Sequence, residues 1–331
     1  MPLVPPRISR RHALRALVAV LVVLGALVWW LKPFGKPELK GELTFSTGVR
    51  TGVYHRYGQL LEIELRRDMP GVKVRLETSE GSQQNLQRVA AGEADFTVAT
   101  ADAVAKYRQD GKPGATALRG CARLYDDYVQ LVVPAGSPVQ SARDLRGKRV
   151  AVGQPGSGVR LISERMLTAA RLDPARDITP VSIGIDTMPQ ELEAGRIDAF
   201  FWSGGLPTNA VRELSERFEI RLVQLGDLVE HLQGTGSPAR YYRAAVMPQD
   251  AYARARNTSS VTTLAVPNLL VTTEKTDPEL TEQFTRTVIL SRDRIGHEVH
   301  AAQLVDLRTA IYTDPLDLHE GARSYYRSVK P

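Results

Sequence analysis

Three stretches of this 331-residue chain place glycine beside hydroxyl or amide side chains, where an apolar run gives way to a helical pattern. Their residues are Ser46, Thr47, Gly48, Arg50, Thr51 and Gly52, then Gly81, Ser82 and Asn85, and finally Gly156, Ser157 and Gly158. A helix that begins in such a turn presents free backbone N–H groups and a partial positive charge. Three such ends facing one cleft would favour a small anion. The alternative is helix capping for each hydroxyl and a tight turn for each glycine, but their coincidence in both halves of the chain favours binding.

Three larger side chains near these stretches could also contact a ligand. Arg50 stands between two glycines, so its guanidinium could bind a carboxylate through two parallel hydrogen bonds; a solvated loop arginine is the alternative. Tyr54 begins the helical pattern after the first stretch. Trp202, followed by Ser203 and Gly204, ends a predicted strand. We interpret Trp202 as a ring that stacks on a ligand or seals a cleft, with core packing as the alternative.

The sequence contains no catalytic constellation. The segment GQPGSGVR (residues 153–160) lacks the Lys-Ser/Thr of a phosphate-binding P-loop, and no serine sits in a G-x-S-x-G turn. His297 and His300 are three residues apart, whereas a zinc-binding pair on one helix face is usually four apart. Asp126 and Asp127 could form an acid/base pair, but adjacent carboxylates at a hinge are more often surface charges. We therefore predict a protein that is not an enzyme and has no cofactor or metal site, with an enzyme on a binding-protein scaffold as the alternative.

The elements that would position these residues form a unit that occurs twice. Residues 42–100 and 149–204 each read as strand, glycine loop, helix, strand, small-residue turn, helix and a Gly-x-x-Asp turn into another strand. Apolar side chains recur with helical period in both copies, and short β-branched runs mark the strands. Strands that alternate with helices pair in parallel and gather their loops at the carboxyl ends, where ligands bind. The sequence thus predicts an α/β protein of two similar lobes.

Two further apolar runs predict how the lobes connect. Residues 128–134 and 263–273 flank the second copy and are interpreted as strands that leave the first lobe and return to it. The predicted first lobe is therefore discontinuous, residues 41–134 and 256–331, and the second lobe, 135–255, is an insertion. The cleft between them would be a hinge, and the tail from Pro278 would pack as helices on the first lobe.

The N-terminal 40 residues differ from the rest. An uncharged apolar run, residues 16–31, follows a basic flank and ends in Trp29 and Trp30, which is typical of an export segment. Small residues of a peptidase site are missing after the run, so we favour a membrane anchor over a cleaved signal, although the run is short for a span. Both interpretations predict a periplasmic location on the outer side of the inner membrane.

The charge distribution argues against nucleic acid as a partner. The net charge of +6 is concentrated in residues 1–40, which hold seven Lys or Arg and one Glu, so the remainder carries 36 charges of each sign. A neutral fold lacks the basic surface that phosphate backbones require. The only cysteine, Cys121, can form no disulfide within the chain.

The motifs together resemble the TAXI family of extracytoplasmic solute receptors that serve TRAP transporters. The matching segments run in order from a glycine-rich loop to the C-terminus: Thr51–His55, Gly81–Leu86, Gly92–Asp95, Gly147–Gly158, Gly195–Phe201 and His319–Tyr326. The resemblance implies a periplasmic binding protein type II fold and a small carboxylate ligand, glutamate-like or a dicarboxylate, delivered to TRAP-type membrane subunits. Val49, Arg50 and His55–Arg56 depart from the family pattern, and a sensor that signals to a membrane partner is the alternative.

Overall fold

The computed structural model describes residues 10–30, 39–234, 236 and 238–329, without the side chains of residues 10, 12, 13, 28–30 and 233. The chain divides into two units, Met1–Lys40 and Gly41–Pro331. Helix α1 (Arg10–Trp30) and residues 39–40 are the described parts of the first unit. The sequence predicts a linker rich in Lys, Pro and Gly over residues 32–41, of which residues 32–38 lie outside the described residues.

The predicted membrane anchor, residues 16–31, coincides with most of α1; Leu31 and the side chains of both tryptophans lie outside what is described. In the parts of the chain that the structure covers, no helix has both the length and the apolar character to cross a membrane. Anchoring by this segment stays a prediction.

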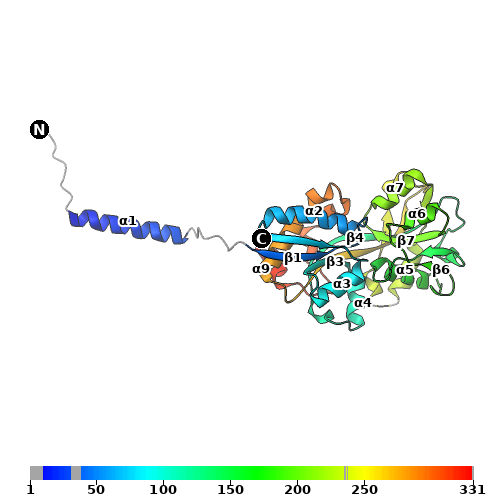
Figure 1. Cartoon of the computed structure of the whole chain (residues 1–331), viewed down its shortest axis with the longest axis horizontal. Coiled ribbons are helices and arrows are strands. Elements are labelled where there is room, and N and C mark those ends of the chain that lie inside the picture. The colour runs from blue at the N-terminus through cyan, green and yellow to red at the C-terminus, as the bar shows by residue number, and fades with distance from the viewer. Residues whose placement is uncertain (1–9, 31–38, 235, 237, 330–331) are drawn as a thin grey trace. The chain divides into compact units, whose positions relative to one another are not determined.

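The first half of the second unit alternates strands with helices, as the sequence predicts. Its elements are β1 (Gly41–Ser46), α2 (Val53–Asp68), β2 (Val72–Glu77), α3 (Ser82–Ala91), β3 (Phe96–Thr100) and α4 (Ala101–Gln109). β1 lies between β2 and β3 and pairs with both in parallel. In Figure 1, α2 lies above and α3 and α4 lie below these strands, so the sheet is covered on both faces. The carboxyl ends of β1 and β3 and the N-termini of α2 and α3 consequently meet at one edge.

The second copy of the unit repeats this arrangement. Its elements are β5 (Arg149–Ala151), α5 (Gly158–Ala169), β6 (Thr179–Val181), α6 (Met188–Glu193), β7 (Ala199–Gly204) and α7 (Asn209–Arg217). β5 pairs in parallel with both β6 and β7. The two lobes predicted from the repeat are therefore present, and each gathers its loops at the carboxyl ends of its strands.

Two long antiparallel strands connect the lobes. β4 (Leu118–Pro134) and β10 (Val261–Thr273) lie side by side in a continuous sheet whose order is β2-β1-β3-β10-β4-β7-β5-β6. The pairing of β10 with β4 shifts register between Pro267 and Leu269, where proline interrupts the hydrogen-bond ladder. This irregularity lies where the strands pass from one lobe to the other. The predicted lobe boundaries after residue 134 and before residue 256 stay predictions, since both strands run through the junction.

The remaining elements complete the two lobes. They are β8 (Ile220–Leu222), α8 (Val229–Gln233), β9 (Arg243–Met247), α9 (Pro278–Leu290), α10 (Arg292–Gly296), α11 (Leu307–Ala310) and α12 (Glu320–Val329). Helix α9 inserts Phe284 against Phe96 and Phe45 of the first lobe, with ring centroids 4.1 and 6.0 Å apart. Helix α9 therefore packs on the first lobe, while the predicted extent of that lobe stays a prediction.

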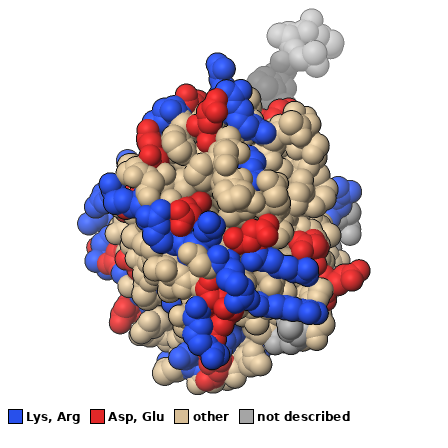
Figure 2. All heavy atoms as spheres, turned by 90° about the vertical axis from the view of Figure 1, so that its right-hand side faces the viewer, with Lys and Arg blue, Asp and Glu red and all other residues tan. Residues whose placement is uncertain are grey.

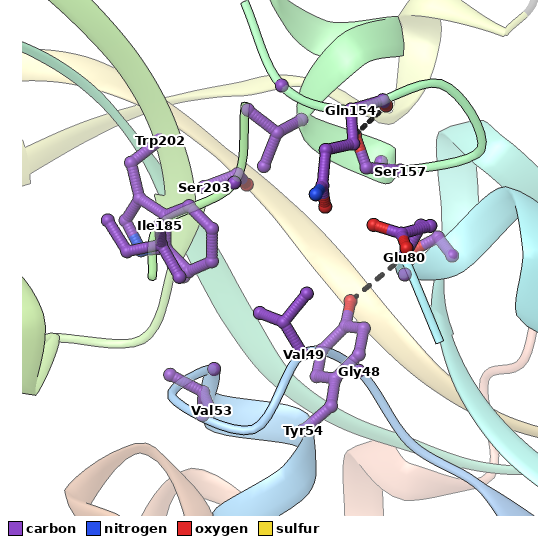
Figure 3. Close-up of a pocket in the computed structure, with 18 of the residues that line it drawn as sticks. Gly48, Val49, Val53, Tyr54, Glu80, Gln154, Ser157, Ile185, Trp202 and Ser203 are labelled. Atoms are coloured by element: carbon purple, nitrogen blue, oxygen red, sulfur yellow. Dashed lines mark hydrogen bonds between the residues drawn. The ribbon is translucent and has the colours of Figure 1, made fainter. Parts of the chain in front are cut away.

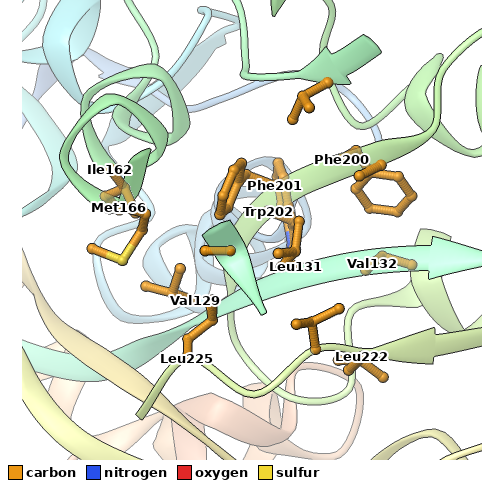
Figure 4. Packing of buried hydrophobic residues seen from close by; sticks show 14 of the residues in the cluster. Val129, Leu131, Val132, Ile162, Met166, Phe200, Phe201, Trp202, Leu222 and Leu225 are labelled. Atoms are coloured by element: carbon orange, nitrogen blue, oxygen red, sulfur yellow. The ribbon is translucent and has the colours of Figure 1, made fainter. Parts of the chain in front are cut away.

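A large apolar core holds the second lobe together. Figure 4 shows Phe200, Phe201 and Trp202 of β7 beside Leu131 and Val132 of β4. Phe200 and Phe201 are fully buried, and Trp202 is 9% exposed. Burying aromatic side chains of this size contributes roughly 2–3 kcal/mol each. β7 is thereby fixed against the connecting strand, which fixes the position of the loop that follows it.

The end of the folded unit formed by the second lobe carries charges of both signs. Figure 2 shows Lys and Arg side chains interspersed with Asp and Glu on this face. Ion pairs of this lobe join Arg149 to Asp198 at 2.7 Å and Arg196 to Glu191 at 2.6 Å. Exposed pairs of this kind contribute little to stability, but they leave this face with charges matched rather than uniformly basic.

Candidate functional site

A cavity lies between the two lobes at the carboxyl ends of their strands. It encloses about 620 Å³, counting the part that opens to solvent. Figure 3 shows Val49, Val53 and Tyr54 of the first lobe on one side and Trp202 and Ile185 of the second lobe on another, with Glu80 and Gln154 facing each other. Small-molecule sites commonly have this size, a mostly apolar wall and a few polar groups.

Three of the helices that begin at this cavity follow the predicted glycine and hydroxyl turns. Gly52 precedes α2, Gly81 precedes α3 and Ser157 precedes α5, and all three residues line the cavity. The first N–H groups of a helix have no partner within the helix. A Cβ on Gly81, whose φ is +126°, would lie 3.5 Å from the backbone nitrogen of Gly158. The N-termini of α3 and α5, one from each lobe, therefore approach each other closely.

Most of the residues proposed from the sequence line this cavity. They are Gly48, Gly52, Tyr54, Gly81, Ser82, Ser157, Gly158, Trp202, Ser203 and Gly204. Ser157 also caps the N-terminus of α5, which was the alternative role, because its Oγ accepts a hydrogen bond from the N–H of Arg160 at 3.0 Å. Gly52 and Gly81 provide no side-chain cap.

Three proposed residues are buried behind the cavity wall instead. Asn85 Nδ2 donates to the Thr47 carbonyl at 2.7 Å, and Ser46 Oγ donates to Asn85 Oδ1 at 2.7 Å. Asn85 Oδ1 also accepts from Ser79 Oγ at 2.7 Å. This buried network holds the loop after β1 against the start of α3, so these side chains shape the site without lining it.

The other three proposed residues lie outside the lining set. Arg50 and Thr51 are exposed on the loop before α2. Gly156 has a φ of +87°, and its carbonyl accepts a hydrogen bond from Gln84 N–H at 2.9 Å. Gly156 therefore lies beside the cavity in a contact between the lobes, whereas Arg50 is exposed to solvent.

Sequence reasoning missed several lining residues. Gly153 and Gln154 lie just before the proposed loop at residues 156–158, and Gly184 and Ile185 follow β6. Ligands bind at the carboxyl ends of parallel strands, and applying this rule to every predicted strand would have found all four residues. Thr100 gave no sequence signal, because a threonine at the end of a strand is common. Asp127 was considered only as half of an acid pair.

Asp127 lies at the bottom of the cavity, where β4 crosses between the lobes. It is 3% exposed and accepts a hydrogen bond from Asn268 Nδ2 at 2.7 Å. Burial raises the pKa of Asp127 to about 7, and the neighbouring Asp102 carboxylate adds to the shift. The Tyr54 hydroxyl donates to Asn268 Oδ1, and burial also raises the pKa of Tyr54. These groups form a buried polar part of the cavity wall, in which ionisation of Asp127 or Tyr54 is unfavourable.

Three buried polar atoms of the described lining side chains have no hydrogen-bond partner. They are Glu80 Oε2, Thr100 Oγ1 and Ser203 Oγ, and each is shielded from solvent. Leaving such an atom unpaired costs about 1–3 kcal/mol, and more for a charged group.

The two lobes also touch each other beside the cavity. Gln83 Nε2 donates to the Ser157 carbonyl at 2.6 Å. Further away, Arg165 of α5 donates to the Asp102 carboxylate of α4 at 2.7 Å, and the Tyr242 hydroxyl donates to the same oxygen at 2.6 Å. Asp102 is fully buried and the Arg165 side chain is 15% exposed. We call Asp102, Arg165 and Tyr242 the interlobe triad.

Residues 45–329 match the model of the family described as NMT1-like. Among solved structures, the chain is similar to a protein described as an L-cystine ABC transporter from Listeria monocytogenes, with 15% identity over 81% of this chain and 99% of that one and a TM-score of 0.51. An ancestral arginine-binding protein bound to arginine shares 14% identity over 78% and 98% of the two chains, with a TM-score of 0.51. A protein from Bordetella bronchiseptica shares 17% over 88% and 90%, with a TM-score of 0.50. At these identities the likeness concerns the fold, and it is the two-lobed periplasmic binding protein fold that the sequence predicts.

Proposed function

The chain belongs to the NMT1-like family, and from this premise we propose that it is an extracytoplasmic receptor that captures a small carboxylate solute. The observation that carries the proposal is the meeting of three helix N-termini, from both lobes, at one cavity. Their free N–H groups and partial positive charge would bind a carboxylate without any cationic side chain. The proposed ligand-contacting residues are those of the sequence proposal that line the cavity, together with Thr100.

Solute capture would work through closure of the lobes. A ligand that contacts α2 and α3 on one side and α5 on the other binds fully only when the lobes are together, so it stabilises that state selectively. The register shift at Pro267 lies in the connecting strands, where such a motion has to be absorbed. The closed form would then be what a partner recognises.

The partner in this proposal is a TRAP-type transporter in the membrane. The TAXI motifs support it, since they run through the chain in order from Thr51 to Tyr326. The basic and apolar N-terminal segment would direct export, with residues 16–31 retained as a tether or cleaved. A sensor that signals to a different membrane partner would use the same cavity, and the partner recovered with the closed form distinguishes the two.

Native mass spectrometry of the full-length protein tests the proposal most directly. We expect a small acid to co-purify with the protein and to be released chemically unchanged. An enzyme would instead convert the bound compound into a product. Added small carboxylates should raise the melting temperature, by roughly 5 °C at a concentration a hundred times the Kd. Their amides and sugars should raise it far less. A sugar that gave the largest shift would overturn the carboxylate assignment.

A further inference from the structure

The wall of the cavity is mostly apolar away from the helix N-termini. In Figure 3, Val49 and Val53 of the first lobe lie on one side of the cavity, and Trp202 and Ile185 of the second lobe lie on another. Val49 and Val53 are partly buried. The aliphatic side chains of the lining set are Val49, Val53, Val159, Ile162, Ile185 and Met188. A wall of this kind favours a solute with apolar surface, which leaves water when the solute binds.

The side-chain donors of Trp202 and Ser157 are occupied within the protein. Trp202 Nε1 donates to Thr208 Oγ1 at 3.0 Å, so the indole offers a solute its ring rather than a hydrogen bond. Ser157 Oγ donates to the carbonyl of Gln154 at 2.7 Å while it accepts from the N–H of Arg160. Neither side chain therefore has a donor left for a polar group on the solute.

The hydroxyl groups of Tyr54 and Ser82 are occupied in the same way. The Tyr54 hydroxyl donates to Asn268 Oδ1, so Ser82 Oγ is the donor in its 3.3 Å contact with the Tyr54 oxygen. The hydroxyl oxygens of Thr100 and Ser203 have no partner, but both are shielded from solvent. These four hydroxyl groups consequently present no open donor to a solute.

The charges at the cavity are unsuited to a second carboxylate. Within the described lining, the donors that remain for a solute are backbone N–H groups, chiefly those of the helix N-termini, and the Gln154 amide. The acidic side chains of this set are Glu80 and Asp127, and Lys, Arg and His are absent from it. A second carboxylate on the solute would therefore meet no cation, and an unpaired charge in a poorly solvated site is strongly unfavourable.

We propose that the solute is a monocarboxylate with an aliphatic body rather than a glutamate-like acid or a dicarboxylate. This inference rests on the proposed function and narrows it: the helix N-termini hold the carboxylate, and the body lies against Val49, Val53 and Trp202. It departs from the ligand that the family resemblance implies. A glutamate-like acid or a dicarboxylate would place its second charge against these apolar side chains.

The test compares each diacid with the monoacid in which an isopropyl group replaces one carboxylate. The pairs are succinate and 4-methylpentanoate, glutarate and 5-methylhexanoate, and L-glutamate and L-2-amino-5-methylhexanoate, titrated calorimetrically into the full-length wild-type protein. An isopropyl group and a carboxylate have nearly the same shape, so the members of a pair differ mainly in charge and polarity. For every pair that binds, we expect the monoacid to bind at least about tenfold more tightly, the scale for burying two methyl groups.

Val53→Thr tests where the aliphatic body lies. Threonine keeps the shape of the side chain and replaces a methyl group with a hydroxyl, so this change should reduce the preference for the monoacid about fivefold. Val246→Thr is the matched control, because Val246 of β9 is 55% exposed and its replacement should leave every affinity unchanged.

Equal or tighter binding of the diacid by the wild type, or an unaltered preference in Val53→Thr, would overturn the inference and leave the carboxylate receptor standing. Failure of every acid in the set to bind would overturn both. If Val53→Thr did not fold, the comparison of pairs in the wild type would still decide the question.

Discussion

At the scale of single residues, Asp127 makes the stability of the protein depend on pH. Its pKa is raised from 3.8 to about 7 in the folded protein, mainly by burial. The folded state therefore binds a proton more tightly than the unfolded chain, so this residue's contribution is full below pH 4 and is lost as the pH rises through 7. A shift of this size corresponds to at most about 4 kcal/mol.

The substitution Asp127→Asn should remove that dependence. Asparagine keeps the oxygen that accepts from Asn268 and cannot ionise. We expect the variant to match the wild type near pH 4 and to exceed its free energy of unfolding by up to about 4 kcal/mol at pH 8. Urea unfolding of both proteins at several pH values measures this difference. A constant difference across the range would mean that Asp127 ionises normally in the fold.

The residues of the site were predictable to the extent that they are local to one loop. The residue types and spacing around Gly52, Gly81 and Ser157 predict the starts of helices, and all three residues line the cavity. Asp127 and Thr100 reach it from strands whose position depends on pairing with β10, far away in the sequence. The exposed position of Arg50 was not predictable, because the sequence of a loop does not determine the direction in which a long side chain points.

At the scale of elements, the interlobe triad joins α4 of the first lobe to α5 of the second. Removing one member of a buried ion pair is strongly unfavourable because it leaves the other charge uncompensated, on the order of 3 kcal/mol or more. That cost is avoided if the lobes separate and Asp102 becomes hydrated. Loss of Arg165 should therefore open the cleft rather than unfold the protein.

We expect Arg165→Met to show a larger radius of gyration than the wild type by X-ray scattering without solute, and a weaker affinity for it. Arg160→Met is the control on the same helix, because Arg160 bonds Glu164 and Ser182 within the second lobe. That variant should scatter like the wild type. Identical scattering by Arg165→Met and the wild type would show that the triad does not hold the lobes together.

The alternation of strands and helices was the part of the fold that the sequence predicted best. Each β-α unit is closed by local signals, such as the apolar face of α5 and the turn at Gly195. The extent of the connecting strands was less visible: β4 begins at Leu118, ten residues before the run that was interpreted as a strand. Its first part carries Arg119 and Arg123 on either side of three small residues, which gives no clear strand pattern, although the structure buries it as a central strand.

At the scale of the whole molecule, the unit Gly41–Pro331 has its own core and sheet. A chain that begins at Gly41 should therefore unfold within about 2 °C of the full-length protein, since a change of 1 kcal/mol moves the melting temperature of a large domain by only a few degrees. Scanning calorimetry of the two proteins in the same detergent buffer makes the comparison. A much lower melting temperature would mean that residues 1–40 contribute to the fold.

The path of the chain through β4 and β10 also determines when each lobe can be completed as the protein is made. The second lobe is largely contiguous, whereas the first waits for β10, α9 and the Phe284 ring that fills its centre. A nascent chain that ends before residue 261 thus exposes the edge of β3 that β10 will cover. The first lobe therefore cannot be completed until β10 has been synthesised, whereas most of the second lobe is already present by then.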